Sequence, residues 1–148
     1  MKGSKKGILW AALVAVIAIG AIASGLQAGP SEEGRFKLPF DAQVGKMTLQ
    51  TGDYTFSVDR ADGSYGLIRV YRGTESLGIM VPQELDSFHG QFGHAALLCI
   101  RHDGKVTVRA LRLPNIGTFY FEMPKDLQTL LAQQPQMIET VPVQVSGE

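Results

Sequence analysis

The segment HAALLCIRHDGKVTVRALRL, residues 94–113, constrains the fold more than any other part of the chain. Two apolar runs flank the dipeptide Asp103-Gly104, which favours a two-residue type I′ turn because both central positions of that turn need a positive φ. Counting back from such a turn pairs Leu97 with Ala110 across the two strands. We therefore predict a β-hairpin with one small, apolar core face, formed by Ala95, Leu97, Cys99, Val106, Val108 and Ala110.

Short segments of alternating apolar residues occur throughout residues 35–122. In RFKLPF and DYTFSVD every second residue is apolar, which is the pattern of a strand with one buried face. Turn signals that contain glycine recur about every 8–15 residues, a spacing typical of β-sandwiches and barrels. We predict a single all-β domain over residues 35–148, an antiparallel β-sandwich or barrel.

The C-terminal part combines one short helix with a last strand. PKDLQTLLAQQ, residues 124–134, begins with proline and places its leucines on one stripe, which predicts a short helix across an end or a face of the sheet. MIETVPVQV then returns to the strand pattern, and Pro142 predicts an edge strand because proline cannot donate a hydrogen bond to a neighbour. An exposed apolar edge can accept another chain, so Val141, Val143 and Val145 form a candidate interaction surface. The alternative is that this strand only closes the sheet.

Residues 1–28 differ in composition from the rest of the chain. Lysines precede an uncharged run and small residues follow it, as in a secretory signal peptide that is cleaved after Ala23 or Gly25. Residues 8–28 form a run of 21 residues, about 30 Å as a helix, so an uncleaved membrane anchor is the alternative. Both interpretations predict an N-terminal hydrophobic helix, a polar linker over residues 29–34 and a domain outside the cytoplasm, periplasmic or extracellular.

Composition and motifs argue against several classes of function. Residues 1–28 hold three of the 14 basic residues and no acidic residue, so the remainder has 11 basic and 14 acidic residues, a net charge of −3. That balance offers no basic patch for a nucleic acid. A single cysteine excludes an internal disulfide, and neither a phosphate-binding glycine loop nor a serine-nucleophile motif is present. We expect no enzymatic activity and no cofactor.

All three histidines and the cysteine fall in one stretch with the spacing H-x4-H-x4-C-x2-H. In a strand, His94 and His102 share a face but stand roughly 26 Å apart, and Cys99 points to the opposite face. Zinc needs its ligands within about 2.3 Å of one centre, so this spacing does not favour a metal site. Cys-x2-His also occurs in cupredoxins, but the methionine and the distant histidine of that family are missing here. We interpret Cys99 as a small buried apolar residue.

The loop PQELDSFHGQFG, residues 82–93, is long for a hairpin connection, and long loops often carry function. Phe88, His89 and Phe92 form a second candidate interaction surface there. The alternative is that both phenylalanines fold onto the core as a lid.

The stretch PF-x(4)-G-x-x-x-L-x-x-G-x-Y-x-F, from Pro39 to Phe56, together with the hairpin in residues 93–117, resembles a group of uncharacterised exported bacterial β-rich proteins. The resemblance implies export and a β-rich fold, and it implies no activity. The sequence thus leads to the hypothesis of a non-enzymatic cell-envelope protein that contacts another envelope protein or a second copy of itself. The alternatives are a small-ligand or metal-binding β-barrel, and an accessory subunit of a membrane complex anchored through residues 8–28.

Overall fold

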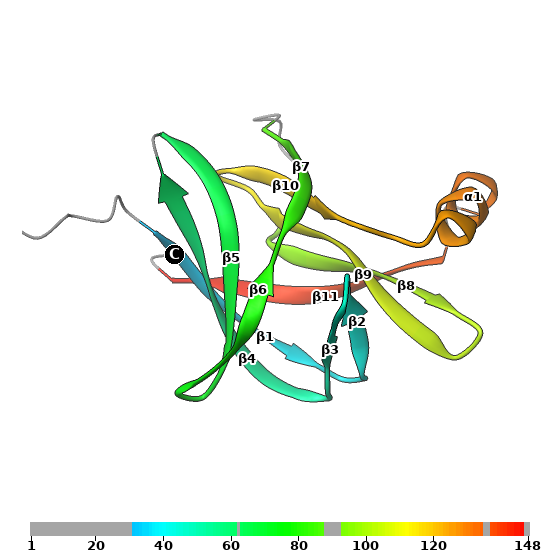
Figure 1. Cartoon of the computed structure of the whole chain (residues 1–148), viewed down its shortest axis with the longest axis horizontal. Coiled ribbons are helices and arrows are strands. Elements are labelled where there is room, and N and C mark those ends of the chain that lie inside the picture. Colours follow the sequence, from blue (N-terminus) through cyan, green and yellow to red (C-terminus); the bar gives the residue numbers. More distant parts are fainter. Residues whose placement is uncertain (1–30, 62, 88–92, 135–136, 147–148) are drawn as a thin grey trace, which may run out of the picture.

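The computed structural model describes residues 31–61, 63–87, 93–134 and 137–146, and within them eleven strands form one sheet that curls into a nearly closed barrel (Figure 1). One short helix accompanies the sheet in this part of the chain. The strands are β1 (Glu32–Leu38), β2 (Ala42–Val44), β3 (Met47–Leu49), β4 (Gly52–Ala61), β5 (Ser64–Arg72), β6 (Glu75–Met80), β7 (Pro82–Asp86), β8 (Ala96–His102), β9 (Lys105–Leu113), β10 (Gly117–Phe121) and β11 (Ile138–Val145), and the helix is α1 (Lys125–Gln133). The all-β prediction is confirmed, and the predicted N-terminal helix lies outside the described residues.

The strand order explains why the sheet nearly closes. It runs β3-β2-β9-β8-β11-β1-β4-β5-β6, and β10 pairs with both β9 and β7. β6 is the last strand at one end of this order, and β7 lies towards the other end through its pairing with β10. Only Val81 separates β6 from β7, so the chain passes directly from one side of the sheet to the other. A seam remains where β6 and β3 each pair with a single neighbour.

Alternation along β1 and β4 builds the barrel interior. Phe36 and Leu38 of β1 and Phe56 of β4 are buried, as the sequence pattern predicts. The Phe36 ring stacks on that of Tyr54 with 5.4 Å between centroids. Complete burial of an aliphatic or phenylalanine side chain contributes about 1.5–3 kcal/mol, so the inward residues of these two strands contribute to the stability of the fold.

The hairpin β8–β9 turns at Asp103 and Gly104 with φ values of 51° and 73°, which confirms the predicted turn. Its register differs from the prediction beyond the middle of the strands. A β-bulge inserts Arg109 as an extra residue, so that Leu97 pairs with Leu111 and Ala110 pairs with Leu98. The bulge reverses which residues of β9 face the interior: Leu111 joins the core cluster, and Ala110, predicted as a core residue, is buried outside that cluster.

Helix α1 begins after Pro124, as predicted, and buries Leu127 and Leu131. Five buried apolar residues do not belong to the barrel core: Ala96, Ile100, Ala110, Leu127 and Leu131. Ala96 and Ile100 alternate with the inward-facing residues of β8, so they lie on its outer face. We infer that α1 covers the outer face of β8 and β9 at this place. None of the helices within the described ranges has the length and apolar character that a membrane span requires.

The last strand, β11, is not an edge strand, and this prediction was wrong. Its first half pairs with β8 and its second half with β1, so it links the two ends of the described chain inside the sheet. Pro142 is the last residue paired with β8, and pairing with β1 begins at Val143. The missing N–H of proline therefore coincides with the point where one neighbour replaces the other.

Candidate functional site

Of the sequence-predicted interaction residues, the structure describes the three valines of β11, and two of them are buried. Val141 and Val143 are only 3% and 8% exposed and belong to the barrel core, and Val145 packs against it. Phe88, His89 and Phe92 lie outside the described residues. The predicted loop is also shorter than expected, because residues 82–86 form strand β7, which pairs with β10.

The structure separates the described histidines from the cysteine. Cys99 is completely buried in the core. His102 lies at the end of β8 with its Nε2 3.1 Å from Oδ2 of Asp103. The backbone oxygen of His94 accepts a hydrogen bond from Arg112 Nε at 3.2 Å. Among the residues that the structure describes, no three His, Cys, Asp or Glu side chains are grouped so that they could hold a metal ion.

Burial determines the chemistry of Cys99. It raises the pKa of the thiol from 9.0 to about 12, because the thiolate would lose its hydration in the core, and the carboxylate of Glu139 adds to the effect. At neutral pH the side chain is therefore an uncharged thiol without access to solvent. The thiolate is the nucleophilic form of cysteine, so Cys99 is a packing residue.

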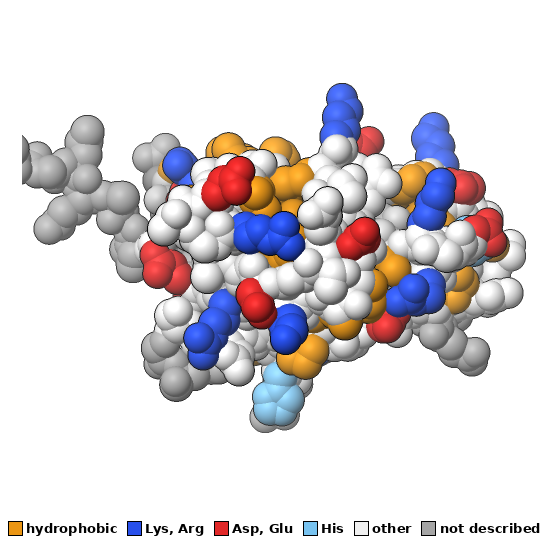
Figure 2. All heavy atoms as spheres, turned by 90° about the horizontal axis from the view of Figure 1, so that it is seen from below, with side chains coloured by type: hydrophobic (Ala, Val, Ile, Leu, Met, Phe, Trp, Pro, Cys, Tyr) orange, Lys and Arg blue, Asp and Glu red, His pale blue; other side chains and the backbone are white. Residues whose placement is uncertain are grey.

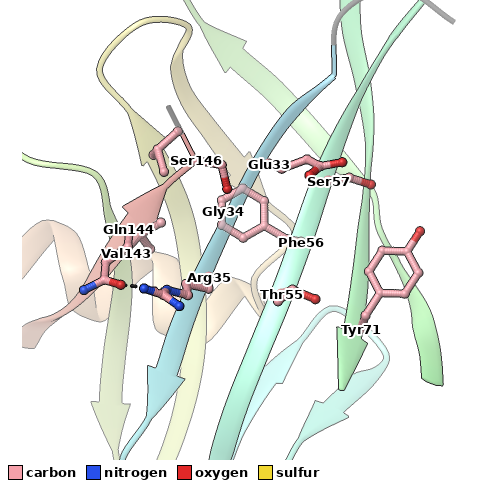
Figure 3. Close-up of a pocket in the computed structure, with 11 residues that line it drawn as sticks. Glu33, Gly34, Arg35, Thr55, Phe56, Ser57, Tyr71, Val143, Gln144 and Ser146 are labelled. Carbon is pink, nitrogen blue, oxygen red and sulfur yellow. Dashed lines mark hydrogen bonds between the residues drawn. The ribbon is translucent and has the colours of Figure 1, made fainter. Parts of the chain in front are cut away.

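A hollow on the outside of the sheet is a candidate site (Figure 3). We call it the outer hollow. It has a volume of about 920 Å³ and crosses the neighbouring strands β11, β1, β4 and β5. A second hollow of about 600 Å³ adjoins it and shares Arg35, Thr55 and Gln144 with it, so the two form one continuous surface.

Strand register sets the side chains of the outer hollow in lateral rows. One row passes from Gln144 through Arg35 and Thr55 to Tyr71, as Figure 3 shows from left to right. The neighbouring row contains Glu33 and Ser57 opposite each other, and a third contains Lys37 opposite Asp53. The outward residues of β4 in these rows, Asp53, Thr55 and Ser57, have short side chains, whereas their neighbours on β1 are longer. The short side chains of β4 therefore form the floor of the hollow.

A hydrogen bond holds one end of the first row. Arg35 Nε donates to Oε1 of Gln144 at 2.7 Å. At the other end, Tyr71 lies next to Arg69, whose Nε donates to Oδ2 of Asp59 at 2.8 Å. The hydrogen bond and the charge of Asp59 raise the pKa of the exposed Arg69 guanidinium, with a smaller contribution from Tyr71. The remaining groups of the hollow are hydroxyls and charges of both signs, which can bind a polar ligand.

Charges of both signs also mix on the face drawn in Figure 2, where acidic and basic side chains alternate with hydrophobic ones. No region of a single sign dominates this face. This face therefore carries no basic patch.

A second candidate surface lies at the seam of the barrel. The exposed large apolar residues of the described chain are Leu67, Ile79 and Val81. Ile68 pairs with Met80 and both are buried, so their chain neighbours Leu67 and Val81 face outward on one side of this pair. Ile79, which pairs with Arg69, faces outward on the other side. We call these three residues the seam patch.

A groove of about 430 Å³ accompanies the free edge of β6 beside the seam patch. Lys46 and Met47 of the β2–β3 hairpin line one side of this seam groove, and Leu77 to Val81 line the other. Met47 fills the space below β6, since its Sδ lies 3.1 Å from the point where a Cβ on Gly78 would stand. The groove therefore runs between two strand edges above an apolar floor.

Comparison of the chain with protein-family models, with curated proteins and with solved structures finds no match.

Proposed function

We propose that the chain is a non-enzymatic protein-binding module of the cell envelope and that it binds an extended segment of a partner protein along β6. The observation that carries the proposal is the position of the seam patch. The large apolar side chains that are exposed lie on and beside β5 and β6, close to an edge of β6 with which no described strand pairs. Exposed apolar patches mark interaction sites, and a free strand edge offers backbone N–H and C=O groups to another strand.

The size of the seam patch supports an extended segment as the occupant in place of a folded surface. A stable contact between two folded proteins buries about 800 Å² and 20–30 residues on each side. Three partly exposed aliphatic side chains provide far less. A strand added to β6 needs less apolar area because backbone hydrogen bonds contribute to its affinity, and alternate apolar residues would meet Ile79 and Val81.

Photo-crosslinking in the native host tests this proposal. A photoreactive residue at position 79 is expected to crosslink one partner, and the same residue at position 129, which is exposed on α1, is expected not to. The crosslinked segment is then synthesised as a peptide, and its binding is measured by fluorescence anisotropy. Ile79→Lys and Val81→Lys should weaken binding at least tenfold, and Thr129→Lys should leave it unchanged.

Two results would contradict the proposal. One is the same set of crosslinks from positions 79 and 129. The other is a peptide whose affinity does not respond to Val81→Lys. A crosslink between two copies of the chain would mean that the segment bound along β6 belongs to a second copy of the chain and not to a different protein.

The proposed location outside the cytoplasmic membrane rests on the lysines, the uncharged run and the small residues of residues 1–28. The intact mass of the protein from its native host tests it. A mass without the first 23–28 residues, together with the loss of Trp10 fluorescence, indicates a released domain. A full-length mass in the membrane fraction indicates an anchored subunit, and a full-length mass in the cytosol would contradict export.

A further inference from the structure

We propose that the outer hollow binds a neutral, polyhydroxylated chain, a short oligosaccharide. This site lies on strands β11, β1, β4 and β5, and it does not depend on the proposed function of the seam. Its dimensions suit such a ligand. Four strands about 4.8 Å apart span roughly 14 Å, and residues 33–37 extend about 13 Å along β1.

The functional groups of the hollow match a ligand that carries many hydroxyls. Thr55, Ser57 and Tyr71 present hydroxyl groups, each of which can donate and accept a hydrogen bond. Gln144 presents an amide, which also offers both functions. A sugar hydroxyl likewise needs donors and acceptors side by side, and the rows of the sheet supply them at regular spacing.

Charge balance favours a neutral ligand over an anionic one. Glu33 and Asp53 offset Arg35 and Lys37 within the hollow. A binding site for an anionic polymer needs an excess of positive charge, which this set does not have.

The walls of the hollow are organised before a ligand arrives. Gln144 holds the guanidinium of Arg35 through the 2.7 Å hydrogen bond, which leaves the terminal N–H groups of Arg35 for a ligand. Tyr71 ends the row with a half-buried aromatic ring, a surface against which the C–H face of a sugar ring can pack. A site that is fixed in this way loses less entropy on binding.

Calorimetric titration of the full-length protein with cellohexaose and chitohexaose tests the proposal, with hexagalacturonate as the acidic comparison. At least one neutral probe is expected to bind more tightly than the acidic one. Thr55→Val removes one hydroxyl at constant shape and should weaken binding about fivefold. Tyr71→Ala removes the ring and should weaken binding about tenfold or more.

Matched variants test whether a loss of affinity comes from the group removed from the hollow or from a change elsewhere in the protein. Thr48→Val on β3 and Tyr120→Ala on β10 remove the same groups from other outward positions and should leave the affinity unchanged. The seam variant Val81→Lys should also bind the oligosaccharide normally, so the two proposals fail independently. The proposal is overturned if neither neutral probe binds, if the acidic probe binds more tightly, or if the control variants weaken binding as much as Thr55→Val does.

Discussion

At the scale of single residues, the packing around Gly34 leaves no room for a side chain. A Cβ at this position would lie 2.5 Å from Cζ of Phe56 and 2.8 Å from the backbone oxygen of Gln144. One neighbour is a buried ring and the other is backbone in a paired strand, so neither can move without disturbing the core. Overpacking of this kind costs about 1–3 kcal/mol, and we expect Gly34→Ala to lower the free energy of unfolding by that amount in urea titrations.

Gly66 provides the matched control on another strand of the same sheet. A Cβ there would meet its nearest atom, the backbone oxygen of Asp59, at 4.0 Å, an ordinary contact. Gly66→Ala should therefore be neutral or slightly stabilising, because alanine restricts the unfolded chain more than glycine does. Equal losses in the two variants would show that the close approach of Phe56 to Gly34 has no energetic consequence.

Cys99 predicts a pH dependence of stability at alkaline pH. Its pKa is 9.0 for a free thiol and about 12 in the fold, so between these values the unfolded chain has lost a proton that the folded chain retains. The stabilisation is fully present below pH 9 and decreases as the pH rises towards 12, by at most about 1.4 kcal/mol per pH unit. The free energies of unfolding of the wild type and of Cys99→Val are measured in urea at pH 8, 9.5 and 10.5. As the pH rises, the wild type should lose stability relative to the variant. A constant difference would contradict the raised pKa.

At the scale of elements, the alternation of apolar residues predicts most of the strands. It does not predict the local exceptions in strand pairing, which change the register and the choice of neighbour. The turn at Asp103 follows from the sequence because its backbone conformation is a property of two residues. The bulge at Arg109 has no comparable signal, so the register beyond it was wrong. Pro142 was interpreted as an edge residue, although a missing N–H is equally compatible with a residue at which one partner strand replaces another.

Helix α1 gives a prediction at the same scale. If it covers the outer face of β8 and β9, Leu131→Ala should lower the free energy of unfolding by about 2–3 kcal/mol, within the range for buried leucines. Leu130 is only partly buried on the same helix, and Leu130→Ala should cost less than half as much. Guanidinium titrations of both variants measure the difference. Similar losses would mean that the helix does not pack through its Leu127–Leu131 stripe.

At the scale of the whole molecule, the candidate surfaces were beyond prediction from the sequence. Leu67 and Ile68 are both apolar, as are Ile79, Met80 and Val81, so alternation cannot tell which of them face inward. Only closure of the barrel decides that Ile68 and Met80 are interior. The outer hollow likewise combines residues from both ends of the described chain, and their adjacency depends on the pairing of β1 with β11.

That pairing leads to the last prediction, because β11 joins β8 to β1 and thereby connects the two halves of the sheet. Ser146 N also donates to the backbone oxygen of Glu33 at 2.8 Å, which ties the two ends together. A chain that ends after Gln134 should lack cooperative unfolding and dispersed amide resonances. Its β1 and β8 edges would be unpaired, and Val141 and Val143 would be missing from the core. A chain that begins at Ser31 retains every strand pairing of the described structure and should unfold cooperatively. Native-like resonances in the shortened chain would mean that the remaining strands fold without β11.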